Sequence, residues 1–350
     1  MARARRTNRG TVTIQDVAEA AGVSTMTVSR VMNGAVNVRE ETRQRVLEAV
    51  AELNYSPNVA ARSLAAGNAT HVGLFYANPS DAYLTQFLVG ALEGARRAGC
   101  HLVLEVCEGE TAEAQAEATR RFAQTNVEGV ILPPPISEYE PVHAELAAAN
   151  IPVVTVARAR MAGDLNVGID DYRGAFELTR YLIGLGHRRI GLIRGHPRHM
   201  ASDERHRGFV DAMVEAGIDP ATAPVEQGYF SYRSGLEAAE RLLDRTPRPT
   251  AIFASNDDMA AAAVGVAHRR GLDVPGDLSV VGFDDTSLAT TVWPELTTIR
   301  QPIAAMAEAA LDILLLKLRG RHASTAGAPP TNLLDFEFIE RDSAGPPRSG

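Results

Sequence analysis

The 350-residue sequence contains only two cysteines, Cys100 and Cys107, and their spacing does not match a metal-binding pair. A chain so poor in cysteine has no disulfide framework and fits a reducing cytoplasm. No uncharged apolar run is long enough to span a bilayer, and the arginine-rich N-terminus does not read as a secretory signal. We therefore expect a cytoplasmic protein with no membrane partner.

Motifs of several enzyme classes are also missing. No Walker loop, dinucleotide fingerprint or Gly-x-Ser-x-Gly nucleophile elbow follows any strand-like apolar run. His196, His199 and His206 lie in a loop-like segment, which favours a polar pocket wall over a zinc site. Asp284 and Asp285 are neighbours on one backbone, a poor arrangement for a facing catalytic pair. We expect no enzyme and no cofactor, with turnover of a sugar derivative as a remote alternative.

Charge is unevenly distributed along the chain. The net charge is −8, yet residues 1–66 hold nine arginines against six acidic residues, so the acidic excess belongs to the remainder. Four of these arginines lie in the first ten residues without an acidic neighbour. This predicts a basic flexible arm over residues 1–12 that is drawn to phosphates, with a solubility tail as the alternative.

Residues 13–34 predict two short helices joined by a turn, the pattern of a helix-turn-helix. Thr13 is a suitable N-cap, and Asp16 completes a capping box. Gly22 can adopt the left-handed conformation that turns the chain, and Ser24 can cap the second helix. An amphipathic stretch at residues 40–53 would close a small three-helix core.

The second of these helices presents a face suited to the major groove of DNA. With Val28 and Val31 turned inward, the side chains of Thr25, Met26 and Arg30 point outward. An arginine can bond both acceptors of a guanine edge, and a methionine can contact a thymine methyl group. The alternative is any small three-helix bundle with a polar face.

A further short helix is predicted at residues 57–68, where Pro57 suits the first turn and Gly67 suits the end. Its apolar face is too small for stability in isolation. We expect it to order on DNA, where Leu64 would wedge between bases in the minor groove. An ordinary linker is the alternative.

From His71 onward, apolar runs alternate with amphipathic stretches, which predicts a doubly wound α/β architecture. The expected buried parallel strands are residues 72–76, 102–106, 129–132, 153–156, 190–194, 251–254 and 279–283. The expected helices are residues 87–98, 112–123, 176–185, 209–216, 236–243 and 259–270. A second series begins near Ile169, so we expect two similar lobes with a ligand cleft at the carboxyl ends of their strands.

Polar side chains gather after these predicted strands. Converging Asp, Asn and Arg residues suit a polyhydroxylated ligand, because fixed donors and acceptors bind its hydroxyls. The rings of Tyr83 and Phe230 would pack against the apolar face of such a ligand. Asp203 and Asp257 are interpreted as helix caps or lobe-packing residues, since Asp often caps a helix that follows a strand.

Residues 13–67 resemble the DNA-binding headpiece and hinge of the LacI/GalR family of bacterial transcription regulators. The matching motifs are Thr-Ile-Gln-Asp-Val-Ala, Gly-Val-Ser-Thr-Met-Thr-Val-Ser-Arg-Val-Met-Asn-Gly, Leu-Asn-Tyr-Ser-Pro-Asn and Ala-Arg-Ser-Leu. The resemblance implies a dimer that binds a near-palindromic double-stranded operator. It also implies base reading by Thr25, Met26 and Arg30, phosphate contacts by Ser24, Thr27 and Asn33, hinge contacts by Asn58 and Ala61, and intercalation by Leu64.

The rest of the chain resembles the effector domain of the same regulators, which has the fold of periplasmic sugar-binding proteins. The matching motifs include Gly-His-Arg-Arg-Ile-Gly-Leu-Ile, Ala-Ser-Asn-Asp-Asp-Met-Ala and Leu-Thr-Thr-Ile-Arg-Gln-Pro. The resemblance implies that the principal effector-binding residues are Arg205 and Asp284, with Tyr83, Asp171, Phe230 and Asn256 on the pocket wall. The loop 196–202 matches the family pattern poorly, so we expect ligand-specific contacts there, including one from Ser202. The resemblance also implies a mono- or disaccharide effector, with nucleobases as a second class.

The predicted fold class is an all-α helix-turn-helix headpiece with a hinge helix, followed by an α/β two-lobed effector domain like type I periplasmic binding proteins. The expected segments are an arm (1–12), headpiece (13–56), hinge (57–68), effector-binding and dimerisation domain (69–341) and disordered tail (342–350). No leucine heptad follows Phe338, so a homodimer is expected. The expected function is an effector-controlled repressor. An activator, a corepressor-dependent repressor and a sugar-binding module without DNA function are the alternatives.

Overall fold

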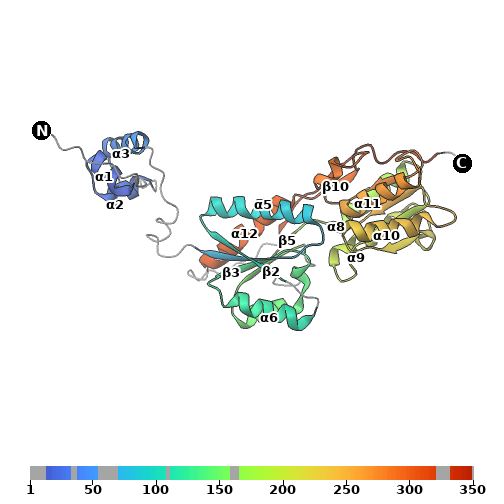
Figure 1. Ribbon diagram of the computed structural model, residues 1–350, viewed down its shortest axis with the longest axis horizontal. Coiled ribbons are helices and arrows are strands. Elements are labelled where there is room, and N and C mark those ends of the chain that lie inside the picture. Colours follow the sequence, from blue (N-terminus) through green and yellow to red (C-terminus); the bar gives the residue numbers. More distant parts are fainter. Residues whose placement is uncertain are drawn as a thin grey trace. The chain divides into compact units, whose positions relative to one another are not determined.

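The computed structural model describes residues 13–32, 38–53, 70–107, 111–157, 165–320 and 332–348. They belong to two compact units, one within residues 1–69 and the other within residues 70–350 (Figure 1). We call the first the headpiece and the second the two-lobed domain, and we describe each by itself.

The described part of the headpiece contains helices α1 (Ile14–Ala21), α2 (Thr25–Met32) and α3 (Glu40–Glu52). The capping box predicted for α1 is present, because Thr13 donates to Asp16 through its N–H and its hydroxyl at 2.8 and 2.7 Å. Gly22 ends α1 with a φ of 63°, in the left-handed region where glycine is favoured. The turn between α1 and α2 is therefore formed as the sequence predicts.

One valine from each helix holds the headpiece together. Val17, Val28 and Val46 are fully buried and belong to one hydrophobic cluster. The guanidinium of Arg45 on α3 donates to Ala21 O at 2.8 Å, which ties the third helix to the turn. Because α2 contributes Val28 to this core, its opposite face is left for solvent or a partner.

Lobe 1 of the two-lobed domain is built on a parallel sheet with strand order β11-β5-β4-β3-β1-β2. The strands are β1 (His71–Tyr76), β2 (His101–Val106), β3 (Gly129–Leu132), β4 (Val153–Val156), β5 (Asn166–Gly168) and β11 (Asn332–Leu333). The helices are α5 (Asp81–Ala98), α6 (Ala112–Ala123), the 3-10 turn η1 (Ile136–Glu138), α7 (Glu140–Ala148) and α12 (Ile303–Gly320). Figure 1 shows α5 and α12 on one face of the sheet and α6 on the other, so the central strands are covered on both faces.

Lobe 2 is built on a second parallel sheet with strand order β7-β6-β8-β9. The strands are β6 (Ile190–Arg194), β7 (Val225–Gln227), β8 (Ala251–Ala254) and β9 (Ser279–Val281). The helices are α8 (Asp171–Gly184), α9 (Met200–Glu215), α10 (Tyr232–Leu243) and α11 (Asp257–Arg269), with the 3-10 turns η2 (Pro220–Thr222) and η3 (Ser287–Thr290). Helices α8 and α9 pack together, and α10 packs on α11.

The chain joins the lobes after β5, after β10 (Thr298–Arg300) and after β11. Strands β10 and β12 (Glu337–Ile339) pair as an antiparallel ribbon beside these connections. After β10, α12 returns to lobe 1 and packs along α5, where Gly90 permits the close approach. A Cβ atom on Gly90 would lie 2.3 Å from the carbonyl oxygen of Ala304 in α12.

The expected two-lobed α/β architecture is confirmed, and each of the seven expected strands is present, although β9 ends at Val281 rather than at residue 283. The sequence did not predict the short strands β5, β7, β10, β11 and β12 or the helices α7 and α12. Half of the residues of α12 are buried, and most of its sequence is apolar, so the polar stripe by which an amphipathic helix is recognised is narrow.

The segment after β12 packs on lobe 2, so the prediction of a disordered tail at residues 342–350 is wrong for the described part, which ends at residue 348. Ser343 is fully buried. Its hydroxyl donates to Val280 O at 2.6 Å and accepts from the Thr297 N–H at 2.9 Å. The Gly- and Pro-rich composition suggested disorder, but the order comes from bonds to the backbone of lobe 2, which composition does not reveal.

Candidate functional site

The headpiece presents a polar helix face of the kind expected for DNA reading. Ser24 caps α2 by accepting from the Thr27 N–H at 3.2 Å, and the two hydroxyls lie 2.9 Å apart. Thr25, Met26 and Arg30 are exposed on α2, with the Met26 side chain 65 % exposed. A large apolar side chain gains nothing from water at this place, but it would pack against a thymine methyl group. The other predicted DNA contacts, Asn33, Asn58, Ala61 and Leu64, lie outside the described residues, as do the arm and the hinge.

A pocket between the two lobes is lined at the carboxyl ends of their strands, where doubly wound folds bind ligands. The space between its walls, including the part that is open to solvent, is about 490 Å³. Lobe 1 contributes the segments after β1, β3 and β4, and lobe 2 contributes the segments after β6, β7, β8 and β9. The lining residues are Asn78, Pro79, Ser80, Tyr83, Pro134, Pro135, Glu138, Ala157, His199, Ala201, Arg205, Phe230, Asn256, Asp284 and Gln301.

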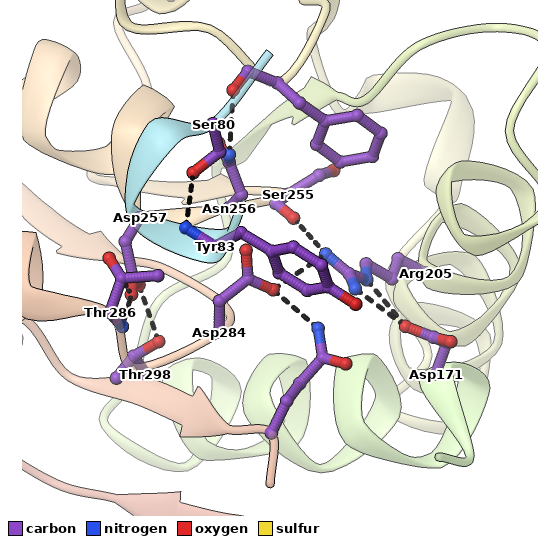
Figure 2. Close-up of polar contacts among 12 residues, drawn as sticks. Ser80, Tyr83, Asp171, Arg205, Ser255, Asn256, Asp257, Asp284, Thr286 and Thr298 are labelled. Carbon is purple, nitrogen blue, oxygen red and sulfur yellow. Dashed lines mark hydrogen bonds and ion pairs between the residues drawn. The ribbon is translucent and has the colours of Figure 1, made fainter. Parts of the chain in front are cut away.

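Arg205 is the centre of the polar network in this pocket (Figure 2). Its guanidinium donates twice to Asp171 Oδ1, from Nε at 2.9 Å and Nη2 at 2.8 Å. The Nη1 group donates to Ser255 O and lies 3.5 Å from Asp284 Oδ1. The guanidinium carbon is 3.7 Å from the centre of the Phe283 ring. These contacts fix both the position and the plane of a side chain that is only 4 % exposed.

The surroundings of the Asp284 carboxyl group have opposing effects on its pKa. Burial raises its pKa from 3.8 to about 7, against the opposing effects of Arg205 and of the Gln301 amide, which donates to Asp284 Oδ1 at 2.6 Å. Burial also raises the pKa of Asp171, although the ion pair with Arg205 opposes this. The network therefore offers a ligand both a fixed cation and carboxylates of unequal acidity.

The hydroxyl of Tyr83 has no hydrogen bond to the rest of the chain as far as the structure describes it. In Figure 2 its ring lies alongside Arg205 and Asp284. Burial raises the pKa of Tyr83, and the negative charges of Asp284 and Asp171 raise it further, so the phenol stays protonated. The Oη atom is buried and has no hydrogen-bond partner among the described residues. A buried hydroxyl of this kind normally has a partner, so this one is suited to bind a ligand.

An aromatic wall closes another side of the pocket. Phe230 has a φ of 62° and stacks on His199, with ring centres 5.6 Å apart. His199 in turn stacks on His196 at 4.3 Å. Burial lowers the pKa of His199 to about 3, so its ring is uncharged at neutral pH. No group of His, Cys, Asp and Glu residues suited to a metal ion occurs in the part of the chain that the structure describes.

Asn256 lines the pocket, but its side chain already has partners. It caps α11 by accepting from the Met259 N–H at 3.0 Å, and its amide donates to Phe230 O at 2.9 Å. It thereby holds Phe230 in its positive-φ conformation. Asn256 was predicted as a wall residue; it does line the pocket, and its amide also binds the backbone of Phe230.

Ser202 and the two aspartates interpreted as caps lie away from the pocket wall. The segment 196–202 was expected to be a loop, but α9 begins at Met200, and Ser202 is fully buried on this helix outside the lining. Asp203 pairs with Arg194 on the surface of lobe 2. Asp257 is fully buried and accepts from Thr286 and Thr298, as a lobe-packing residue would.

Two pairs of residues form hydrogen bonds from one lobe to the other at the pocket. Ser80 in lobe 1 donates to Asp258 Oδ2 in lobe 2 at 2.6 Å, and Glu138 in lobe 1 accepts from the Met200 N–H of α9 at 3.0 Å. Sequence reasoning missed Glu138 and also Gln301. Gln301 directly follows β10, a strand that the sequence did not predict. No sequence signal marks Glu138.

Comparisons with known proteins agree with both units. Residues 13–58 match the family model described as bacterial regulatory proteins, lacI family, and residues 179–344 match the periplasmic binding protein-like domain. No helix in the described ranges is long and apolar enough to cross a membrane.

The curated relatives are transcriptional regulators of nearly the same length. The HTH-type transcriptional regulator DegA of Bacillus subtilis is 37 % identical over 84 % of this chain and 88 % of its own. Catabolite control protein A of Priestia megaterium is 34 % identical over 87 % of this chain and 91 % of its own. The HTH-type transcriptional repressor PurR of Photobacterium profundum is 34 % identical over 89 % of this chain and 93 % of its own.

Solved structures show the same organisation. A complex of the transcriptional regulator CelR with cellobiose has a TM-score of 0.71 and 30 % identity, covering 95 % of this chain and all of that one. The Lac repressor dimer bound to operator and an anti-inducer has a TM-score of 0.73 and 29 % identity, covering 96 % of this chain and all of that one. With its helix-turn-helix and two-lobed pocket domain, the chain belongs to the lacI family of bacterial transcriptional regulators.

Proposed function

We propose that this regulator is a homodimeric repressor that binds a near-palindromic operator through α2 and is controlled by a small molecule in the interlobe pocket. The observation that carries the proposal is the buried Arg205–Asp171–Asp284 network beside the Tyr83 hydroxyl, which no other described residue binds. Such a network at the wall of a pocket is suited to bind a polar ligand. The arm and hinge would add phosphate and minor-groove contacts. DNA binding places the protein in the cytoplasm.

The favoured effector is a mono- or disaccharide. The Asp284 carboxyl and the Tyr83 hydroxyl bind donor-rich ligands, and the Phe230 ring would pack on the apolar face of a sugar. The relative crystallised with cellobiose supports this class. The nearly parallel stack of His199 and Phe230, with 14° between the rings, favours a planar nucleobase as the second class.

The two hydrogen bonds that join the lobes at the pocket give the effector a way to control DNA affinity. A ligand changes DNA affinity only if it binds the DNA-competent and incompetent conformations with different affinity. The pocket is lined by both lobes, so its shape depends on how they close. We propose that effector binding changes this closure and that the change is transmitted to the operator-binding units of a two-fold dimer.

The test is a fluorescence-anisotropy titration of the full chain on DNA from upstream of its own gene, repeated with a panel of sugars and nucleobases. We expect tight, salt-dependent binding that one compound abolishes, with Asp284→Ala binding DNA but not responding. Tightening by a compound would indicate a corepressor. An unchanged response of Asp284→Ala would refute the pocket assignment, and failure on selected genomic DNA would refute the operator proposal.

A further inference from the structure

Glu138 is a pocket residue whose partner belongs to the opposite lobe. It ends the turn η1 in lobe 1, and both of its carboxylate oxygens lie 3.0 Å from the backbone nitrogen of Met200. Met200 is the first residue of α9 in lobe 2. His199, which precedes the helix, makes no side-chain cap bond, so the carboxylate of Glu138 caps the helix from across the cleft.

The start of α9 is also the place where this pocket would otherwise bind an anion. Amide groups in the first turn of a helix carry partial positive charge, and they commonly bind phosphates and carboxylates. His199 and Ala201, on either side of Met200, both line the pocket. The anion position at this wall is therefore accessible from the pocket, and the protein already fills it with a carboxylate of its own.

The other charged side chains of the described pocket lining also disfavour an anionic ligand. Arg205 is the one cationic side chain among them, and Asp171 and Asp284 already surround it. An anionic ligand would meet the negative charge of Glu138 at short range, where water screens it little, and the carboxyl oxygens of Asp284 at the other wall. A hydroxyl or N–H donor would instead find acceptors at both places.

We propose that the pocket accepts uncharged effectors and rejects phosphorylated or carboxylated forms of the same compounds, with Glu138 as the specificity-determining residue. The proposal rests on the proposed function, since it concerns the ligand of the same pocket. It means that the regulator responds to an unmodified ring compound. A reaction that transfers a phosphoryl group to that compound would then end the signal.

The first experiment needs no knowledge of the effector. Full-length wild type, Glu138→Ala, Glu138→Gln and the control Glu140→Ala, an exposed residue two positions on, are titrated with inorganic phosphate by calorimetry at constant ionic strength. We expect no saturable binding by wild type or control and saturable phosphate binding by both Glu138 variants. Saturable phosphate binding by wild type, or no gain in either variant, overturns the proposal.

Hydrogen exchange at the start of α9 shows whether the variants remain folded and whether the cap exists in solution. The Met200 amide should exchange at least about tenfold faster in Glu138→Ala than in Glu140→Ala, with the core strands unchanged. Equal exchange rates of the Met200 amide in these two variants would show that Glu138 does not cap α9. Glu138→Gln keeps the size of the side chain, so a loss of folding confined to the alanine variant does not prevent the test.

The second experiment compares glucose with glucose 6-phosphate and adenosine with its 5′-monophosphate as agents that change operator binding. If a phosphorylated member acts on wild type at a lower concentration than its neutral partner, the specificity proposal is wrong. If no compound of any panel alters DNA binding, the proposed effector control fails, while the phosphate titration still decides the role of Glu138.

Discussion

Replacing Arg205 by methionine tests whether the pocket network is a charged unit or a set of independent contacts. Methionine keeps much of the length and the apolar stem of arginine, but it leaves Asp171 and Asp284 without their cation. Both carboxyl groups are nearly inaccessible to water, with side chains 11 % and 6 % exposed. Removing one partner of a buried pair costs about 3–5 kcal/mol, because the remaining charge is neither paired nor hydrated.

The measurement is the free energy of unfolding in urea, followed by circular dichroism on the full chain. We expect a loss of about 3–5 kcal/mol for Arg205→Met. The control is Arg207→Met on the same helix, whose side chain is 58 % exposed and pairs with Glu204. That surface pair should contribute about 1 kcal/mol or less.

A second replacement separates charge from packing. The double variant Asp171→Asn/Arg205→Met lacks one of the two carboxylates that lose their cation. Its loss of unfolding free energy should therefore be about 2 kcal/mol smaller than the sum of the losses of the two single variants. Both variants should still bind the operator without responding to an effector. A loss below about 1 kcal/mol in Arg205→Met, or strictly additive losses, would refute the account of the network.

Three further predictions concern other parts of the molecule. Arg30→Ala should weaken operator binding by about 1–3 kcal/mol and relax specificity at one base pair, which anisotropy on single-base operator variants measures; equal loss on every sequence would indicate a phosphate contact instead. The raised pKa of Asp284, about 7 against 3.8, means that the folded protein retains a proton, so this residue contributes stability below about pH 4 that is lost as the pH rises toward 7. Asp284→Asn should flatten the unfolding free energy over that interval relative to wild type, and parallel pH profiles would contradict the assignment. Gly90→Ala should destabilise by about 1–3 kcal/mol because its Cβ meets α12, whereas Gly184→Ala on α8, with open space at this position, should not lower the melting temperature.

Local signals in the sequence determine the headpiece almost completely. Thr13 and Asp16 are three residues apart, so their bonds depend only on helix geometry, and Gly22 is readable because few other residues accept its φ. The outward position of Arg30 follows from the inward position of Val28 and Val31 on the same helix.

The pocket was predictable in place but not in its bonding. Parallel strands end at one edge of their sheet, so the side chains after β6, β8 and β9 of lobe 2 had to lie near one another. Which of them would bond to each other was not determined by that rule. Asn256 was expected on the wall, yet its amide is used to hold Phe230, a residue 26 positions away in sequence.

The contacts that join the lobes lie furthest from the reach of sequence patterns. Ser80 and Asp258 are 178 positions apart, and Glu138 and Met200 are 62 apart. A serine before a helix reads as a cap, and Ser80 does cap α5, but its hydroxyl also donates to the other lobe. A bond of this kind depends on how the two lobes are arranged, so no local pattern in the sequence predicts it. If effector control acts through lobe closure, the Ser80–Asp258 and Glu138–Met200 bonds help to determine how strongly an effector changes DNA binding. The size of this change must then be measured on variants of these residues, because the residues that line the pocket do not determine it alone.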